Sequence, residues 1–485
     1  MEIQTYRERV EQEFARMRAK GRDSYRPVYH LTPLAGTLAD PNGLCRIGDT
    51  YHIYYVTNPL NCVTKERTAC VWGHYSTKDF VHYRREPVAV WPDDRRDQDG
   101  VYSGSALVRD GKIYFYYTGN VRHAGDYDYV LEGREQNVLR VDSADAVHFQ
   151  NKMLLMTNED FPSDMTRHVR DPQMVEKDGE VYMLLGARTK EDRGCVLVYR
   201  SSDLVHFEQV NLLDTKDAFG YMWECPDLAE LDGQSFLLAC PQGIPHETYR
   251  FQNSHQCGYF PLRGDFAGAY ELGDFEQFDY GFDFYAARTL KEAKGRTLLI
   301  GWLGMSEAEY GKTPSAARGW DQAIAMPREL TLRDGRLYQR PLEELKALRK
   351  NHTEQDGTGT FQIQSDCFEL RLCLERQQNL CVRLREDCVL AYDAARRELT
   401  LSLGETCGQG RDRRSMRLEK LEELRIFMDA TIVEIFINDG YAVMTSRIFG
   451  ESRELLVEAF EGKLDFYEMR GFEIEELEEQ HEYSF

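Results

Sequence analysis

The segment ADPNGLCRIGDTYHIYY (39–55) joins a carboxylate, a glycine turn and an aromatic-rich strand, and related segments return four more times along the chain. They are YSGSALVRDGKIYFYY (102–117), VRDPQMVEKDGEVYMLL (169–185), WECPDLAELDGQSFLLA (223–239) and FDFYAARTLKEAKGRTLLIGW (282–302). Their turn glycines, about 54 to 68 residues apart, are Gly48, Gly111, Gly179, Gly233 and Gly295. A repeat of this spacing, built only of strands, is typical of β-propeller blades.

Acidic or hydroxyl side chains precede four of these turns at nearly the same distance. Asp40, Ser103 and Asp171 lie about eight residues before their glycine, and Glu224 lies about nine before it. Equivalent positions in propeller blades lie at equivalent places around one axis. We therefore expect Asp40, Asp171 and Glu224 to meet at one end of a central funnel. Holding three carboxylates close together costs free energy because like charges repel, which indicates that they serve a chemical function.

The composition sets limits on the class of protein. With 485 residues, the chain is long enough for two or three domains, and its net charge of -22 argues against nucleic acid or an anionic membrane as a partner. Its 12 cysteines show no metal-ligand spacing, so we expect free thiols in a reducing compartment and no metal. The charged N-terminus lacks the apolar region of a signal peptide, and no membrane span is found. These features predict a cytoplasmic protein.

Regular apolar spacing predicts the structure outside the repeat. Residues 3–20 carry apolar side chains in steps of three and four, which predicts a helix that packs on the propeller. The stretch PLEELKALRK (341–350) is predicted to form a short helix at a domain boundary. Beyond it, period-two runs such as FELRLCLE and TIVEIFIND predict antiparallel strands in two packed sheets.

Three histidines recur once per repeat, in YSTKDFVHY (75–83), VDSADAVHF (141–149) and RSSDLVHFE (200–208). Catalytic residues are not expected at every equivalent position of a repeat. We therefore interpret His82, His148 and His206 as structural side chains that stabilise an outer-strand turn.

Two carboxyl groups across a scissile bond are the usual equipment for glycoside hydrolysis, one protonated and one ionised. In A-D-P-N-G, a rigid turn aims the side chain of Asp40. The guanidinium of Arg170 is expected to keep Asp171 ionised, because the two are adjacent in sequence. Glu224 lies between Trp223 and Cys225, and these apolar neighbours are expected to raise its pKa, as suits an acid.

An ordered set of motifs resembles glycoside hydrolase family 32, the family of invertases, fructanases and sucrose-6-phosphate hydrolases. The set comprises HLTPLAGTLADPNG (30–43), VWGHYSTKDFVHY (71–83), WPDDRRDQDGVYSGSA (91–106), VRDP (169–172), MWECPDL (222–228), DFYAARTL (283–290) and GWDQAIAMPREL (319–330). LRIFMDATIVEIFINDG (424–440) resembles the family's C-terminal sandwich. Within the family, YRPVYHL (25–31) and PQGIPHETYRFQNSHQCGYF (241–260) are most similar to cytoplasmic sucrose-6-phosphate hydrolases.

The resemblance implies an all-β fold: a five-bladed propeller followed by a sandwich. The expected division is an N-terminal helix and lead-in (1–27), a catalytic propeller (28–335), a linker helix (336–355) and a β-sandwich (356–485).

The resemblance also implies a retaining β-fructofuranosidase that needs no cofactor and acts on sucrose, sucrose 6-phosphate or short fructooligosaccharides. Asp40 is then the nucleophile, Asp171 the stabiliser of the transition state, and Glu224 the acid and base. The side chains expected to line or support the fructosyl pocket are Trp72, Ser103, Arg170 and Trp302.

Two positions depart from the family pattern. Ala39 stands where the family usually has asparagine beside the nucleophile, and Val56 stands where it usually has glutamine. Each lost hydrogen bond is worth about 0.5–1.5 kcal/mol, so the pocket is expected to be altered.

Two other functions stay open on the sequence alone. One is a different furanosidase on the same scaffold, acting with inversion. Carboxyl groups about 5–5.5 Å apart favour retention, and about 6.5–9.5 Å favours inversion. The other is a weakly active sugar-binding protein. The sequence fixes neither the leaving group, nor the chain-length preference, nor the oligomeric state. A phosphate site would need cations at the funnel rim, for which loop positions suggest Lys65, Arg67, Arg95, Arg96, Lys312 and Arg318.

Overall fold

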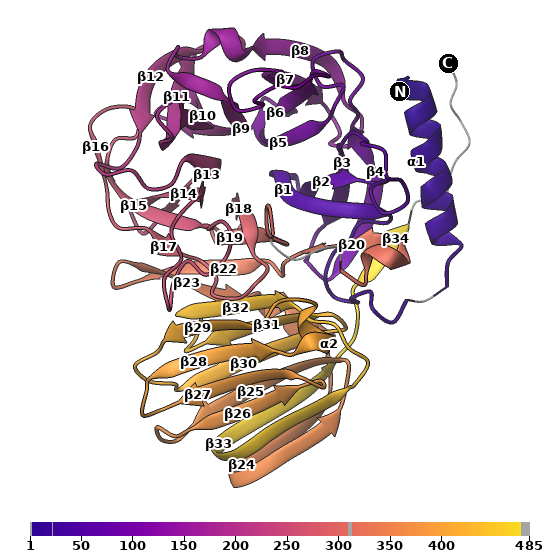
Figure 1. Cartoon of the computed structure of the whole chain (residues 1–485), viewed down its shortest axis with the longest axis vertical. Helices are drawn as coiled ribbons and strands as arrows, with labels where there is room; N and C mark the ends of the chain where they lie inside the picture. Colours follow the sequence, from indigo (N-terminus) through magenta and orange to yellow (C-terminus); the bar gives the residue numbers. More distant parts are fainter. Residues whose placement is uncertain (1, 22, 309–312, 477–485) are drawn as a thin grey trace.

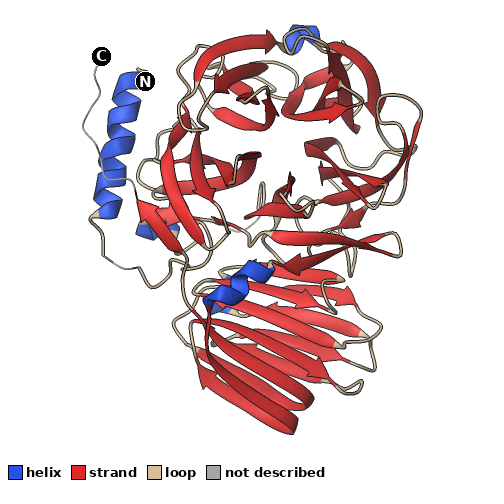
Figure 2. Ribbon diagram, turned by 180° about the vertical axis from the view of Figure 1, so that it is seen from behind, coloured by secondary structure: helices blue, strands red, loops and turns tan. Residues whose placement is uncertain are grey.

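The computed structural model describes residues 2–21, 23–308 and 313–476. Within these ranges the chain is almost entirely β, with one long helix, a ring of sheets and a separate layered β-domain beneath it (Figures 1 and 2). This confirms the prediction of an all-β fold with a propeller arrangement and a C-terminal sandwich.

Five antiparallel sheets, taken in chain order, form the ring. The first contains β1 (Gly36–Ile47), β2 (Thr50–Asn58), β3 (Val71–Thr77) and β4 (His82–Val90). The second contains β5 (Val101–Arg109), β6 (Lys112–Arg122), β7 (Arg134–Ser143) and β8 (Gln150–Met156). The third contains β9 (Met165–Lys177), β10 (Glu180–Thr189), β11 (Gly194–Ser201) and β12 (Glu208–Leu213). The fourth contains β13 (Met222–Leu231), β14 (Gln234–Gln242), β15 (Gly258–Gly264), β16 (Tyr270–Leu272) and β17 (Glu276–Gln277). The fifth contains β18 (Tyr285–Lys291), β19 (Thr297–Leu303), β21 (Ala323–Ile324), β22 (Arg328–Arg333) and β23 (Arg336–Pro341).

The first strand of every sheet lies on the inside of the ring. β1 contacts β5, β5 contacts β9, β9 contacts β13, β13 contacts β18, and β18 contacts β1 again. Figure 1 shows these strands around the centre, with the later strands of each sheet farther out. Residues on the five first strands are therefore brought to a common axis.

The first and second strands are joined by a two-residue hairpin turn in the first four sheets and by a five-residue loop in the fifth. The five glycines of the repeat all have positive φ, from +59° at Gly48 to +89° at Gly295. At Gly111, Gly179 and Gly233 the preceding aspartate is also left-handed, as a type I′ turn requires. The turns predicted from the sequence are confirmed.

The repeated histidines cap a second set of turns. His82, His148 and His206 each place Nδ1 2.7 Å from the Oδ2 of an aspartate three residues earlier, in Asp79, Asp145 and Asp203. Oδ1 of the same aspartate accepts the histidine's backbone N–H at 2.8 Å. All three histidines are exposed, so their structural interpretation is confirmed.

Helix α1 (Ile3–Arg18) packs its apolar stripe against the outside of the ring. Tyr6 and Val10 are buried against Leu60 and Val71, and Met17 lies against Trp320. No helix among the described residues is long and apolar enough to cross a membrane.

A ten-stranded sheet forms the C-terminal domain and folds into two layers. Its strands are β24 (Arg349–Gln364), β25 (Cys367–Leu374), β26 (Leu380–Leu384), β27 (Cys388–Asp393), β28 (Glu398–Leu403), β29 (Arg413–Arg417), β30 (Glu423–Asp429), β31 (Ile432–Ile437), β32 (Ala442–Arg447) and β33 (Glu454–Met469). The long strand β33 pairs with β26 along its first part and with β25 along its last part, so it belongs to both layers. The short helix α2 (Glu405–Gly408) connects two strands of one layer.

The connection between the ring and this domain is shorter than the helix expected there. Six residues, Glu343–Leu348, form the 3-10 helix η3 between β23 and β24. Its two buried leucines, Leu345 and Leu348, are three residues apart, a spacing that puts them on one side of a 3-10 helix. The remaining residues of the expected linker helix extend as strands.

Buried ions join the two parts of the molecule. The guanidinium of Arg328, on β22, contacts Asp279 at 3.2 Å and Glu434, on β31, at 2.7 Å. The same glutamate accepts a contact from His30 at 3.1 Å, and the other nitrogen of His30 lies 2.8 Å from Asp429. Since all five side chains are almost completely shielded from solvent, they fix the orientation of the sandwich on the ring.

Parallel pairings close the first sheet from both sides. β20 (Trp320–Asp321), preceded by the 3-10 helix η2 (Ala316–Arg318), pairs with β1. β34 (Glu473–Glu476), which follows the sandwich, pairs with β4. A third 3-10 helix, η1 (Asn158–Asp160), follows β8.

Candidate active site

The three carboxylates expected to converge and Ser103 come from four of the five inner strands, and each strand is irregular where they lie. Pairing is interrupted in β1 around Asp40, in β5 before Gly104, in β9 near Asp171 and in β13 after Glu224. Such bulges turn side chains away from the regular alternation of a strand. They point these groups toward the axis of the ring.

Asp40 is bound by the hydroxyl of Ser103, which donates to its Oδ2. The side-chain amide of Asn42 donates to the backbone carbonyl of Asp40 at 2.8 Å, and its oxygen accepts the N–H of Gly104 at 2.9 Å. Burial, together with the charge of Asp171, raises the pKa of Asp40 to about 6 in spite of the serine. The carboxyl is held in one orientation and is ionised at neutral pH.

Asp171 is buried and has left-handed backbone, with φ +65°. Its N–H is held by Thr118 Oγ1 at 2.9 Å, and its Oδ2 accepts the N–H of Cys225 at 3.0 Å. Positive φ in a non-glycine residue costs on the order of 1–3 kcal/mol and persists where the surroundings enforce it. This strain places the carboxylate beside β13.

Glu224 has three donors. Arg170 Nη2 lies 2.5 Å from its Oε1, while Tyr285 and Gln242 donate to Oε2 at 2.7 and 2.8 Å. Burial opposes its ionisation, but Arg170 outweighs burial and the pKa of Glu224 is lowered. In this structure Glu224 is therefore ionised at neutral pH.

The expected electrostatic roles of Asp171 and Glu224 are thus reversed, and the prediction was wrong. The guanidinium of Arg170 turns to Glu224, while its Nε lies 3.9 Å from Asp171. Burial raises the pKa of Asp171, and the more distant Arg170 only partly offsets this. Adjacency in sequence did not reveal which carboxylate faces the guanidinium.

The thiol of Cys225 joins the carboxylates. Its Sγ lies 3.6 Å from Asp40 Oδ2 and 3.7 Å from Asp171 Oδ2. The hydrogen bond with Cys240 lowers the pKa of this thiol, but burial and the charges of Asp171 and Asp40 together outweigh it and raise the pKa, so the thiol stays protonated and acts as a weak donor. Asp40 and Asp171 therefore lie on either side of one sulfur atom.

Four residues of this cluster were not predicted as site residues: Cys225, Gln242, Tyr285 and Arg288. Arg288 lies near both Asp40 and Asp171, because its charge lowers the pKa of each. Tyr285 and Arg288 belong to the fifth copy of the repeat, where they lie ten and seven residues before Gly295, on either side of the position that carries a carboxylate in three other copies. Alignment of the five copies could therefore have pointed to this segment.

The two tryptophans expected at the pocket differ in exposure. Trp72 has no exposed surface, and its indole N–H donates to the carbonyl of Tyr102 at 3.0 Å. Trp302 is 8% exposed, and its Nε1 has no hydrogen-bond partner among the described residues. Trp72 thus fits a supporting position behind the pocket, and Trp302 fits its wall.

Ala39 and Val56 lie together on neighbouring strands. Ala39 packs against the apolar cluster that contains Val56 and Trp72, and Val56 is 7% exposed. An apolar surface therefore lies beside Asp40, where the family pattern has two amides.

Of the cations considered for the funnel rim, two are engaged elsewhere. Arg96 pairs with Asp94 at 2.6 Å, and Arg318 pairs with Asp23 at 2.8 Å. Lys312 lies outside the described residues.

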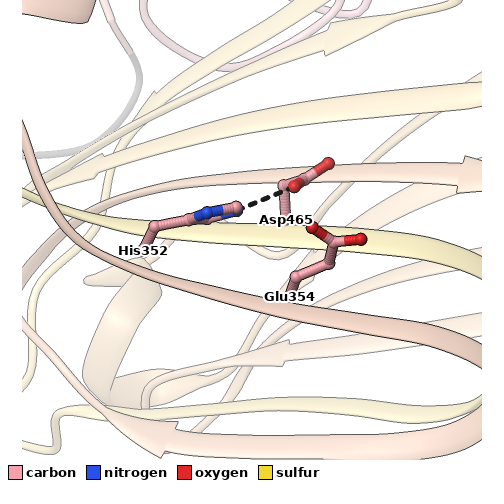
Figure 3. A group of neighbouring side chains, drawn as sticks. All are labelled: His352, Glu354 and Asp465. Atoms are coloured by element: carbon pink, nitrogen blue, oxygen red, sulfur yellow. Dashed lines mark hydrogen bonds and ion pairs between the residues drawn. The ribbon is translucent and has the colours of Figure 1, made fainter.

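One group of metal-ligand side chains lies in the sandwich, far along the sequence from the carboxylates (Figure 3). His352 lies 2.8 Å from Asp465, and Glu354 is paired with the ammonium group of Lys463 at 3.1 Å. Because a protein cation already neutralises Glu354 and the group is largely exposed, it has the character of a surface ion-pair cluster.

The inner strands of the ring bring together one buried carboxylate, two partly buried carboxylates and an arginine, and such paired carboxyl groups are the catalytic groups of glycoside hydrolases. The chain belongs to glycosyl hydrolases family 32. The family's N-terminal domain model matches residues 30–341, and its C-terminal domain model matches residues 337–470.

Among curated relatives, the chain is 37% identical to the sucrose-6-phosphate hydrolase of Klebsiella pneumoniae over 444 residues, covering 88% of this chain and 89% of that one. It is 34% identical to the Bacillus subtilis (strain 168) enzyme of the same name, with the same coverage of both chains. Among solved structures, it is similar to the sucrose-6-phosphate hydrolase of Lactobacillus gasseri, with a TM-score of 0.85, 28% identity and 96% of both chains covered. It is also similar to the family 32 β-fructofuranosidase of Bombyx mori, with a TM-score of 0.83 and 27% identity, over 97% of this chain and 99% of that one. A variant of the Bombyx mori enzyme is described in complex with sucrose.

Proposed function

We propose that this glycoside hydrolase is a β-fructofuranosidase that cleaves the fructosyl bond of sucrose, sucrose 6-phosphate or a short fructooligosaccharide with retention of configuration. The observation that carries the proposal is that Asp40 and Asp171 both contact the thiol of Cys225, while Glu224 lies close enough to both carboxyl groups to raise their pKa. The names of the relatives and the sucrose complex of the Bombyx mori variant support the substrate class.

The reaction has two displacements. The carboxylate of Asp40 attacks the anomeric carbon of the fructosyl unit, the bond to the bridging oxygen breaks, and Glu224 gives that oxygen its proton. Glu224 then removes a proton from water, the water oxygen attacks the same carbon, and the bond to Asp40 breaks. Asp171 binds sugar hydroxyls and stabilises the positive charge of both transition states.

For Glu224 to act as the acid, substrate binding has to raise its pKa, because Arg170 keeps the carboxylate ionised in the free protein. Sugar hydroxyls that attract the guanidinium away from Glu224, together with further burial, would raise its pKa. The pKa of Asp40 is about 6, so a small rise in pKa within this cluster is enough to bind a proton at neutral pH. Arg170 therefore acts both on the sugar and on the protonation of the acid.

The finer organisation is also proposed. Each of the five sheets of the ring is one blade of a five-bladed propeller, which forms the catalytic domain at 28–335, after a helix and lead-in at 1–27. The connection at 336–355 and the sandwich at 356–485 complete the chain. Trp72, Ser103, Arg170 and Trp302 line or support the fructosyl pocket. None of the buried cysteines in the described part of the chain forms a disulfide, which supports a reducing, cytoplasmic location.

The test is release of reducing sugar by the purified chain from sucrose, sucrose 6-phosphate and short fructooligosaccharides. Reaction in aqueous methanol, followed by nuclear magnetic resonance, reports the configuration of the methyl fructoside. Retention is expected. Inversion would indicate a different furanosidase mechanism, and the absence of hydrolysis on the whole panel would favour a sugar-binding role.

A further inference from the structure

A line of cationic and neutral side chains leads outward from Glu224. The guanidinium of Arg170 contacts Glu224 at 2.5 Å on one side and Nδ1 of His168 at 2.9 Å on the other. The second ring nitrogen of His168 lies 3.2 Å from Nη1 of Arg134. Arg170 is 8% exposed, whereas His168 and Arg134 are only partly buried. The line therefore runs from Glu224 toward less buried side chains.

His168 cannot satisfy both guanidinium groups. Its burial, followed by the charges of Arg170 and Arg134, lowers its pKa far below neutrality, so the ring is uncharged. A neutral imidazole has one acceptor nitrogen and one N–H, whereas guanidinium groups only donate. In either tautomer, one guanidinium faces an imidazole N–H and lacks an acceptor there.

Other donors at this place also lack acceptors. Nε of Arg134 and Nε2 of Gln136 are both shielded from solvent and have no hydrogen-bond partner among the described residues. The side-chain oxygen of Gln136 already accepts from Arg170 at 3.3 Å, so its amide nitrogen points elsewhere. A buried donor without an acceptor costs about 1–3 kcal/mol, which a bound acceptor would recover.

Two further arginines lie near Arg134. Arg67 and Arg122 both lie close enough to Arg134 to lower its pKa, although burial is the larger cause. The neighbouring carboxylate of Glu135 is turned to His123 at 3.0 Å and to the amide of Asn137 at 3.2 Å. No carboxylate among the described residues is paired with Arg134.

We propose that Arg134 and Gln136, with Arg67 and Arg122 beside them, bind a phosphate group carried by the sugar that leaves. Guanidinium groups bind phosphate oxygens by paired, charge-assisted hydrogen bonds. The phosphate is assigned to the leaving sugar because the line begins at Glu224, the group proposed to protonate the leaving oxygen. The inference rests on the proposed function and selects sucrose 6-phosphate over unmodified sucrose.

The experiment compares kcat/KM on sucrose 6-phosphate and on sucrose for the wild-type chain, Arg134→Gln and Arg96→Gln. We expect Arg134→Gln to lower kcat/KM on sucrose 6-phosphate by about 10- to 150-fold, the value of one hydrogen bond to a charged group. The loss on sucrose is expected to be at least tenfold smaller. Arg96→Gln is the matched control, because that arginine is occupied by Asp94, and it should alter neither value.

Binding of glucose 6-phosphate, measured by calorimetry, gives a readout that does not depend on turnover. We expect wild-type and Arg96→Gln to bind it alike and Arg134→Gln to bind it about tenfold or more weakly. An equal loss on both substrates would make Arg134 a positioning residue for Arg170 and overturn the phosphate site. A wild-type chain that hydrolyses sucrose without preferring sucrose 6-phosphate would overturn it while leaving the proposed function intact. Inactivity on both substrates would contradict the proposed function itself.

Discussion

The surroundings of Asp40 suit the nucleophile role that we propose for it, because they hold its carboxylate ionised and in one orientation. Ser103 binds one of its oxygens, and burial keeps its pKa near 6, so the anion is available at neutral pH without the weak nucleophilicity of a strongly acidic carboxylate.

Replacing Asp40 by asparagine is expected to abolish nearly all hydrolysis, by about three orders of magnitude or more, because an amide cannot supply the attacking anion. The measurement is reducing-sugar release from sucrose and sucrose 6-phosphate by the purified variant, with circular dichroism to show that the fold persists. Asp49→Asn, at an exposed turn, serves as the control. Turnover near that of the wild type would contradict the role of Asp40.

The Glu224→Gln variant tests the acid. It is expected to be badly impaired on sucrose, about 100-fold or more, and much less impaired on a fructoside whose leaving group departs without protonation. Comparing kcat/KM for the two substrates separates this role from a general loss of structure. Equal impairment on both would remove Glu224 from the acid role.

The apolar surface at Ala39 and Val56 has two readings, which the double variant Ala39→Asn, Val56→Gln can separate. If the lost amides merely weaken a fructosyl pocket, restoring them should raise kcat/KM on sucrose or sucrose 6-phosphate by about 5- to 150-fold, from two hydrogen bonds.

If the pocket is instead reshaped for a modified furanoside, the double variant should lose activity on that sugar and gain little on sucrose. Kinetics on a panel of fructosides decides. The apolar surface described above favours the second reading. No change on any fructoside would show that neither position contacts the sugar.

At the scale of the element, the hairpin turns of the ring depend on backbone conformation and not on packing. Gly179 has φ +83°, and no atom lies within 4 Å of a Cβ built at that position. A substitution there tests the conformation alone.

We expect Gly179→Ala to lower the free energy of unfolding by about 1–2 kcal/mol, because left-handed backbone is unfavourable for alanine. Gly21 also has free space around it but does not have left-handed φ, so Gly21→Ala should be neutral or slightly stabilising. Denaturant midpoints of the two variants measure the difference. Equal midpoints would show that the turn tolerates a side chain.

The hairpin turns are the part of the fold that the sequence predicts best. Each depends on a few adjacent residues, so glycine and aspartate in the sequence sufficed to locate them, and the repeat then placed Asp40, Ser103, Asp171 and Glu224 near one axis. The orientation of Arg170 could not be read in the same way, because it depends on a bulge and on a carboxylate 54 residues away. His168 contacts Arg170 and Arg134, which lie on two different sheets, so no local sequence pattern predicts both contacts.

At the scale of the whole molecule, His30 joins the ring to the sandwich. Burial disfavours the charged imidazolium, but the hydrogen bonds to Asp429 and Glu434 outweigh it and raise the pKa of His30 to about 9. The unfolded chain has a histidine pKa of about 6.5. The folded protein therefore binds a proton at neutral pH that the unfolded chain does not.

The stabilisation from this proton is fully present below about pH 6.5 and is lost as the pH rises to about 9. We expect the free energy of unfolding to fall by about 2–3 kcal/mol between these values, measured by denaturant titration at several pH values. The His30→Gln variant should be less stable at pH 6 and should show a shallower decline. An identical pH dependence in both proteins would exclude His30 as its source.

The parallel pairing of β34 with β4 has a consequence for synthesis. β4 ends at Val90, yet its partner strand ends at Glu476, where the carboxylate of Glu476 pairs with Arg85 at 2.8 Å. At roughly 5–20 residues per second, the ribosome needs about 20–80 s to make the intervening chain. During that time the outer edge of the first sheet lacks the strand that finally covers it, and an uncovered edge invites pairing with other chains. The nascent protein is thus exposed to aggregation at its earliest sheet until nearly all of its described sequence has been translated, the interval in which a chaperone would be of most use.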